Sequence, residues 1–315
     1  MFFCRSRFCL GLDRNGGDIE VLAILAFSMG WVHEAIHVDL EVCLSEKQME
    51  LRGKNWDNQQ ALAKIGEKKV RSLNLYNTSI DDDFLAVLAP RGGLKSIHIV
   101  SEIITDRGIE LLAQQNELES LLLAGVPKVT DASLDSLAHC SSIRELYLTG
   151  TAITDRRLEC LKKLPKLWSL SIGNTSITDE GIRKIASRTI SLISFENCAI
   201  EGHGFASWSQ PDKMSFYGNG SRLTDAGFAT VCASFPQLWN VVISNTRIGN
   251  DGIRALAGQA PTLLRIQKSN IDRRGIEWIV ANLPVHALEV APTQMTQAEA
   301  HALVKPQGLR ISVYE

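Results

Sequence analysis

The residues best suited to chemistry lie in one short segment, His33-Glu34-Ala35-Ile36-His37. On an α-helix, His33 and His37 would lie about one turn apart on the same face, where both imidazoles can bind one zinc ion. Glu34 would then stand beside a metal-bound water and could activate it as a general base. The segment raises the hypothesis of a zinc-dependent hydrolase element.

The segment resembles the H-E-x-x-H motif of zinc metallopeptidases, but its surroundings depart from that family. Asp39 stands where the family usually keeps an apolar residue, and Leu40 and Cys43 occupy the positions of the glycine and third histidine in the extended motif. We therefore favour a helix whose polar face carries His33 and His37. We expect no catalytic residue, metal or cofactor, and the zinc site stays as the alternative.

The element that must position any site is a repeat of about 24 residues, which carries two apolar residues at i and i+2 in each copy. Successive pairs are 24, 24, 24, 25, 24, 23, 21, 27, 23, 24 and 23 residues apart. A fixed period of this length is typical of a solenoid, in which each copy buries the face of its neighbours. The pairs are Met49/Leu51, Leu73/Leu75, Ile97/Ile99, Leu121/Leu123, Leu146/Leu148, Leu170/Ile172, Ile193/Phe195, Met214/Phe216, Val241/Ile243, Leu264/Ile266, Leu288/Val290 and Ile311/Val313.

One copy, residues 167–182, places Leu167, Leu170 and Ile172 at the apolar positions of an L-x-x-L-x-L strand. It resembles the leucine-rich repeat family, and the resemblance covers roughly residues 46–315. Its Ile-Thr-Asp-x-Gly signature, as in Ile177–Gly181, is similar to the cysteine-containing and short bacterial subclass. The resemblance implies an α/β solenoid, a right-handed horseshoe with parallel strands on the concave face and helices on the convex face.

Within a copy, a small polar residue such as Thr151 or Thr175 is expected to bond the loop backbone of the neighbouring copy. An aspartate follows where an N-cap should be, and its carboxylate would accept the free amides of the first helical turn. These aspartates are Asp106, Asp131, Asp155, Asp179 and Asp225.

Residues 1–45 do not follow the repeat and are expected to form an N-terminal segment with a capping helix, before a solenoid of about eleven to twelve repeats over 46–315. The apolar run 19–32 is shorter than the roughly 17–25 residues that span a bilayer. A short membrane-associated helix stays as the alternative.

Composition limits the classes of partner. The chain has 33 basic and 35 acidic residues without a charge block, which argues against a nucleic-acid partner. It has 7 cysteines, and Cys140, Cys160 and Cys232 fall in helical stretches, where burial is favoured over disulfides. These features favour a cytoplasmic protein, with membrane association as the alternative.

The residues that flank each apolar pair should face the concave side of the sheet. Aromatic and arginine side chains are the usual anchors of protein interfaces, although exposed aromatics also pack against cross-strand neighbours. We predict a non-catalytic interaction scaffold for an unidentified protein partner; a ubiquitin-ligase-type substrate adaptor is a further alternative. The predicted contacts are Tyr76, His98, Tyr147, Trp168, Tyr217, Trp239 and Arg265.

Two irregular places add further expectations. The spacing drops to 21 and rises to 27 around Met214, which suggests an inserted recognition loop at Gly218–Ser221 or simple drift. The last strand, at residues 309–314, would leave an open edge, which predicts end-to-end self-association.

Overall fold

The computed structural model describes residues 48–187, 189–208, 213–303 and 308–314. The chain divides between Val42 and Cys43, and the described residues all belong to the second of the two units. The His33–His37 motif, the apolar run 19–32 and the expected capping helix lie outside the described residues.

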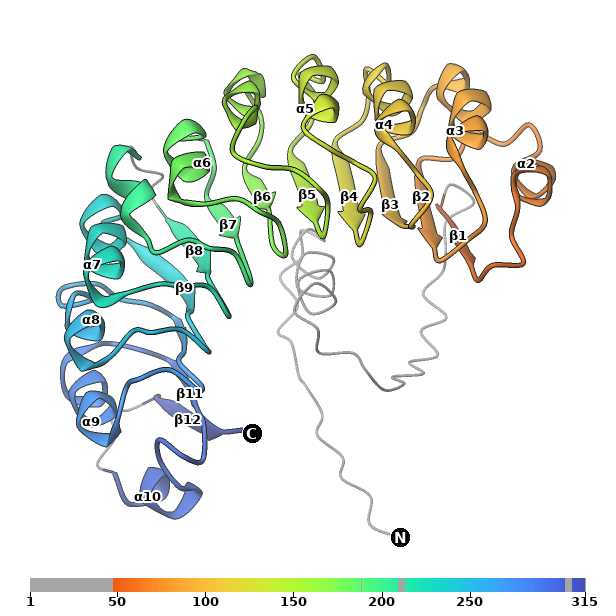
Figure 1. The fold of residues 1–315 in the computed structure, drawn as a ribbon. Helices are drawn as coiled ribbons and strands as arrows, with labels where there is room; N and C mark the ends of the chain where they lie inside the picture. The colour runs from red at the N-terminus through yellow and green to blue at the C-terminus, as the bar shows by residue number, and fades with distance from the viewer. Residues whose placement is uncertain (1–47, 188, 209–212, 304–307, 315) are drawn as a thin grey trace, which may run out of the picture. The chain divides into compact units, whose positions relative to one another are not determined.

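In the described residues, twelve strands form a single parallel sheet whose spatial order is the order of the sequence (Figure 1). Each strand pairs with the next copy in register, so that Leu73 lies opposite Ile97 and Leu75 opposite Ile99. The expected α/β solenoid is confirmed. The strands are β1 (Gln48–Arg52), β2 (Ser72–Tyr76), β3 (Ser96–Val100), β4 (Ser120–Ala124), β5 (Glu145–Thr149), β6 (Ser169–Ser171), β7 (Leu192–Ser194), β8 (Met214–Tyr217), β9 (Leu238–Val242), β10 (Leu263–Arg265), β11 (Ala287–Val290) and β12 (Arg310–Val313).

Helices return the chain from one strand to the next and lie along the outer side of the curved sheet (Figure 1). The α-helices are α2 (Asn58–Ile65), α3 (Asp82–Leu88), α4 (Asp106–Ala113), α5 (Ala132–Leu137), α6 (Asp179–Lys184), α7 (Asp225–Ser234), α8 (Asn250–Arg254), α9 (Arg273–Asn282) and α10 (Gln297–Ala302). Three 3₁₀ segments complete the described set: η1 (Ala89–Arg91), η2 (Leu158–Lys163) and η3 (His203–Ser207).

The core lies between the sheet and the helices and follows the apolar pattern of the sequence. Leu170 and Ile172 are fully buried, and so is Ile177, which closes the core where the chain turns towards α6. The same holds along the solenoid, because each copy places equivalent residues in the same layer.

The repeated aspartate does not cap its own helix, which corrects the expectation from the sequence. The N-caps of α4, α6 and α7 are Thr105, Thr178 and Thr224, whose side chains accept from their own first-turn amides. In these three helices the aspartate is the first helical residue, while Asp131 is at the N-cap position of α5 without a side-chain cap bond. The carboxylate bonds to the following copy instead. That of Asp155 accepts from the backbone N of Thr178 at 2.9 Å and from its Oγ1 at 2.7 Å.

The same pairing recurs along the outer side of the solenoid. Asp106 binds Thr130 and Asp131 binds Thr154 through the same two atoms, and Asp82 binds Thr105. Because the carboxylate satisfies a backbone amide of another copy, it fastens successive repeats together rather than a single helix.

The glycine of the Thr-Asp-x-Gly signature makes room for this carboxylate. A Cβ on Gly181 would lie 2.3 Å from Oδ1 of Asp155, and one on Gly252 would lie 2.4 Å from Oδ1 of Asp225. Where the copy has Ser133 instead, its hydroxyl donates to Asp106. The signature therefore encodes contact between copies.

The small polar residues after each strand also differ from the expectation. Thr151 Oγ1 donates to Leu148 O at 2.7 Å and Thr175 Oγ1 to Ile172 O at 2.6 Å, both within the same copy. The preceding residue has a left-handed backbone (φ 67° at Gly150), which turns the hydroxyl back onto its own strand. Contacts with the neighbouring copy are made by Cys198, whose Sγ lies 3.1 Å from Ile172 O, and by Ser269, whose Oγ accepts from Gln294 Nε2 at 3.2 Å.

The irregular copy around Met214 is a shift of register, not an inserted loop. Ile193 pairs with Phe216, and Phe216 pairs with Val241, so the spacings there are 23 and 25 residues. Gly218 therefore takes the second core position, where a Cβ would lie 2.9 Å from Cζ of Phe195. The large ring of Phe195 fills the volume that a side chain of Gly218 would occupy.

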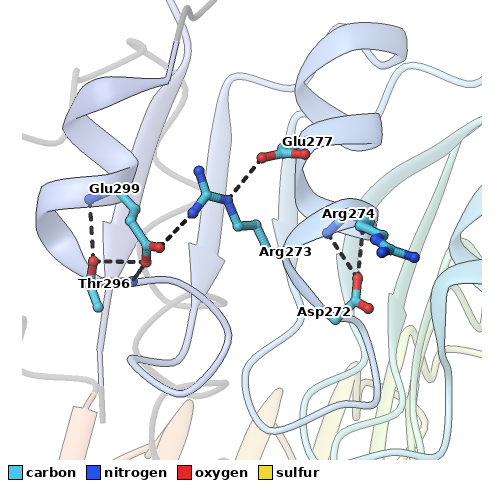
Figure 2. Close-up of polar contacts among 7 residues, drawn as sticks. Asp272, Arg273, Arg274, Glu277, Thr296 and Glu299 are labelled. Carbon is cyan, nitrogen blue, oxygen red and sulfur yellow. Dashed lines mark hydrogen bonds and ion pairs between the residues drawn. The ribbon is translucent and has the colours of Figure 1, made fainter.

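At the C-terminal end, Arg273 of α9 joins two helices (Figure 2). Its Nε donates to Glu277 at 2.9 Å in the same helix, and its Nη1 donates to Glu299 of α10 at 2.7 Å. Glu299 also closes a capping box with Thr296. Within the described residues, β12 has a partner on one side only, and Tyr314 beside it is 46% exposed; end-to-end self-association through this edge stays a prediction.

Candidate protein-interaction surface

The inner side of the sheet presents two rows of side chains, defined by their place relative to the two core residues of each strand. The centre row lies between the core residues, and the trailing row follows the second core residue. The centre row runs Glu50, Asn74, His98, Leu122, Tyr147, Ser171, Ser194, Tyr217, Val242, Arg265, Glu289, Ser312.

The structure distributes the seven predicted contacts over different rows. Four of them, His98, Tyr147, Tyr217 and Arg265, belong to the centre row, while Tyr76 belongs to the trailing row. Trp168 directly precedes β6, and Trp239 is the second residue of β9. The predicted residues therefore do not form a single cluster.

Tyr76 and His98 are brought into contact. The Tyr76 hydroxyl lies 3.0 Å from His98 Nδ1, and the two rings meet edge-on with centroids 4.9 Å apart. Burial, and then the charge of Arg52, lowers the pKa of His98 to about 4. The imidazole is therefore neutral at physiological pH.

Tyr147 and Tyr217 are buried, with 4% and 5% of their surface exposed, whereas the sequence suggested exposed rings. Ser169 Oγ donates to the Tyr147 hydroxyl at 3.3 Å, because rings and hydroxyls on neighbouring strands lie within reach of each other. Burial raises the pKa of Tyr147 to about 12 and also raises that of Tyr217. Both phenols stay neutral, and their polar atoms serve the sheet itself.

Trp239 is the most exposed aromatic residue of the predicted set, with 45% of its surface accessible. The ammonium of Lys213 lies 5.3 Å from the centre of its ring, at a distance typical of a cation–π contact. Trp168 is half-buried. These two indoles offer the apolar area that a partner could cover.

Arg265 is engaged within the sheet. Its guanidinium makes a two-point ion pair with Glu289 on the next strand, with Nε–Oε2 at 2.5 Å and Nη2–Oε1 at 3.1 Å. Only 16% of either side chain is exposed, so the geometry is well defined and poorly screened by water.

Sequence reasoning missed a group of polar side chains in the trailing row. Glu196 Oε1, Ser244 Oγ and Gln267 Nε2 are buried and have no hydrogen-bond partner within the residues that the structure describes. The sequence contained a signal for these residues, because the alternation of a strand places a polar residue directly after a core pair on the inner face. This signal did not identify them as a candidate site, because the sequence alone does not show that these polar atoms are buried.

In the part of the chain that the structure describes, no group of three or more His, Cys, Asp or Glu could hold a metal ion. Across those residues, no helix is long and apolar enough to cross a membrane. Cys140, Cys160, Cys198 and Cys232 are free thiols, as the sequence suggested for three of them.

Comparison with known proteins agrees with this architecture. The family model described as Leucine Rich repeat matches residues 163–186, which span most of the copy that begins at Leu167. A chain from the crystal structure of the Rad7 and Elc1 complex in yeast is similar, with a TM-score of 0.54 and 14% identity over 85% of this chain and 81% of that one. An internalin from Listeria monocytogenes has a TM-score of 0.51 and 15% identity over 85% and 82%. With its parallel sheet and outer helices, the chain has the fold of a leucine-rich repeat solenoid, and residues 163–186 match the repeat itself.

Proposed function

We propose that the protein is a non-catalytic scaffold that binds a partner protein on the inner face of its sheet. The observation that carries the proposal is the single sheet of twelve parallel strands in the described residues, with the exposed indole of Trp239 on β9. At about 4.8 Å per strand the face extends roughly 50 Å, which is long enough for a folded partner. One structural neighbour comes from a complex of two proteins, which is consistent with this role.

The chemistry of the face supports a protein rather than a charged polymer. Its aromatic hydroxyls and imidazole are neutral, and Arg265 is paired with Glu289. A nucleic acid would need a continuous basic surface, and the whole chain has a formal charge of −2. The free thiols suit a reducing, cytoplasmic environment, which we include in the proposal.

An affinity purification with mass spectrometry tests the proposal. The double variant Trp168→Ala/Trp239→Ala removes the accessible indoles, and Val87→Ala, an exposed apolar residue of α3, is the matched control. We expect specific partners with wild type and Val87→Ala that are lost with the double variant. Equal recovery with all three proteins would refute binding through these indoles. The zinc-hydrolase and substrate-adaptor alternatives stay predictions.

A further inference from the structure

The trailing row contains a buried carboxylate, one oxygen of which is unsatisfied. Glu196 is 4% exposed, and its Oε1 has no hydrogen-bond partner among the described residues. The neighbouring position in the row is Gly173, where an added Cβ would sit 3.4 Å from Cβ of Glu196. The row therefore has no side chain directly beside Glu196, at a position where other copies carry one.

Two further unpaired polar atoms lie in the same row. Ser244 and Gln267 are 6% and 7% exposed, and Ser244 Oγ and Gln267 Nε2 lack partners. The backbone fixes their alignment: Asn174 N donates to Glu196 O at 2.7 Å and Asn245 N donates to Gln267 O at 2.7 Å.

The backbone hydrogen bonds between the copies that separate Glu196 from Ser244 are also formed. Asn197 N donates to Asn219 O at 2.9 Å, and Gly220 N donates to Ser244 O at 2.9 Å. Glu196, Asn219, Ser244 and Gln267 therefore occupy equivalent positions on successive copies. At about 4.8 Å per strand the four residues span roughly 15 Å.

Unsatisfied buried polar atoms are rare in native proteins, and several in one row indicate a missing partner. Burial raises the pKa of Glu196 to about 7, while the positive charge of Arg265 acts in the opposite direction. Arg265 is already paired with Glu289, so ionised Glu196 leaves one negative charge in excess among these three groups.

The chemistry of the open atoms defines the complementary ligand. Glu196 needs a donor, preferably a cation; Gln267 Nε2 needs an acceptor; Ser244 Oγ can do either. A polypeptide supplies all of these, through a basic side chain and its main-chain amide groups. An anionic ligand would be repelled by the carboxylate.

We infer that the trailing row from Gly173 to Gln267 is a subsite for a protein partner that places a Lys or Arg side chain over Gly173 onto Glu196, with polar groups of the same segment on Ser244 and Gln267. This inference rests on the proposed binding role of the inner face. Beyond that role, it identifies Glu196 as the residue that anchors the partner and predicts a positive charge on the partner's contacting side chain.

The test uses short random peptides displayed on phage and selected on the immobilised full-length protein. Enriched peptides are synthesised and titrated by calorimetry against wild type, Glu196→Gln and Glu180→Gln. Glu180, an exposed residue of α6 on the outer side, controls for the loss of one negative charge. Gly173→Val is a second variant, which places a side chain where the basic residue of the partner is proposed to pass and keeps the carboxylate of Glu196.

The inference predicts enriched Lys- or Arg-containing peptides whose affinity falls about tenfold or more with Glu196→Gln and with Gly173→Val, but not with Glu180→Gln. Replacing the basic residue of the peptide by norleucine should remove the difference between wild type and Glu196→Gln. Circular dichroism of each variant confirms that it is folded.

Peptides that lose affinity with Trp168→Ala/Trp239→Ala but are insensitive to Glu196→Gln would overturn the inference and leave the proposed function standing. Peptides insensitive to all of these variants, or no enrichment at all, would count against both.

Discussion

Asp155 of one repeat holds Thr178 of the next by two bonds at once, from the backbone N at 2.9 Å and from Oγ1 at 2.7 Å. Thr178 Oγ1 in turn accepts from the amide of Glu180 at 3.2 Å, which begins helix α6. A single carboxylate thus connects the turn before η2 to the capping residue of α6 in the next copy. This relationship gives the Thr-Asp-x-Gly signature its physical meaning.

Replacing Asp155 by alanine should lower the free energy of unfolding by about 1–3 kcal/mol, because two donors of Thr178 lose their acceptor. Urea denaturation of both proteins measures the change. Asp251→Ala is the control: its side chain is 83% exposed and pairs only with Arg254 at the surface, so the expected change is within about 0.5 kcal/mol. Similar losses for the two variants would contradict the role given to Asp155.

Gly181→Ala should destabilise the protein by about 1–3 kcal/mol, because the new Cβ would lie 2.3 Å from Oδ1 of Asp155. The double variant Gly181→Ala/Asp155→Ala removes the nearest of the contacts that the new Cβ would meet and leaves those with Leu158 Cδ1 at 2.6 Å and Ile177 Cγ2 at 2.9 Å. Its loss of stability should therefore be smaller than the sum of the two single losses, as thermal or urea unfolding would show. Strict additivity would mean that the two side chains do not compete for space.

Lys268→Asn should stabilise the protein by about 0.5–1 kcal/mol. Lys268 has φ of 55°, at a position where Asn174, Asn197 and Asn245 have the same left-handed backbone. Asparagine adopts this conformation at lower cost than lysine. Lys128→Asn, an exposed position with an ordinary backbone, controls for the loss of a positive charge and should leave the urea midpoint unchanged. A midpoint that falls with Lys268→Asn would refute the prediction.

Glu196→Gln should change the pH dependence of stability. The pKa of Glu196 is raised in the folded protein from its ordinary 4.5 to about 7, so the folded state holds a proton that the unfolded state releases between these values. Stability from this group is present below about pH 4.5 and is lost as pH rises to about 7. The variant should thus be more stable than wild type by up to about 3 kcal/mol at pH 8 and equal to it at pH 4. Parallel stability curves across this range would contradict the buried carboxylate.

Phe205→Ala should cost about 3–5 kcal/mol, the usual loss for emptying a buried aromatic site. The ring of Phe205 lies in the core 5.3–5.9 Å, centre to centre, from those of Phe195, Trp208, Phe216 and Phe235. In this copy η3 takes the place of an α-helix, so the ring cluster supplies the packing. Val87→Ala, at an exposed site, should change the urea midpoint only slightly.

The sequence by itself determined the fold of the repeats. The apolar pairs at i and i+2 recur about every 24 residues, and in every copy but one they match the observed strand register, as with Leu170 and Ile193. Burial of a side chain at such a position is a local property, because the alternation of a strand decides which face it occupies. The exception, Phe216, shows the limit: the pattern permits Met214/Phe216, and only pairing with Ile193 and Val241 selects Phe216 as the first core residue.

Only the tertiary structure decided what the polar residues do. Asp155 has the same neighbours in sequence whether it caps its own helix or binds Thr178, and the choice depends on a copy 23 residues away. Exposure on the inner face is likewise a property of neighbouring strands: Trp239 is open to solvent while Tyr147 is buried, although both were predicted as contacts. The unpaired oxygen of Glu196 becomes visible only when its surroundings are known, because a hydrogen bond and its absence are facts about partners rather than about residue types.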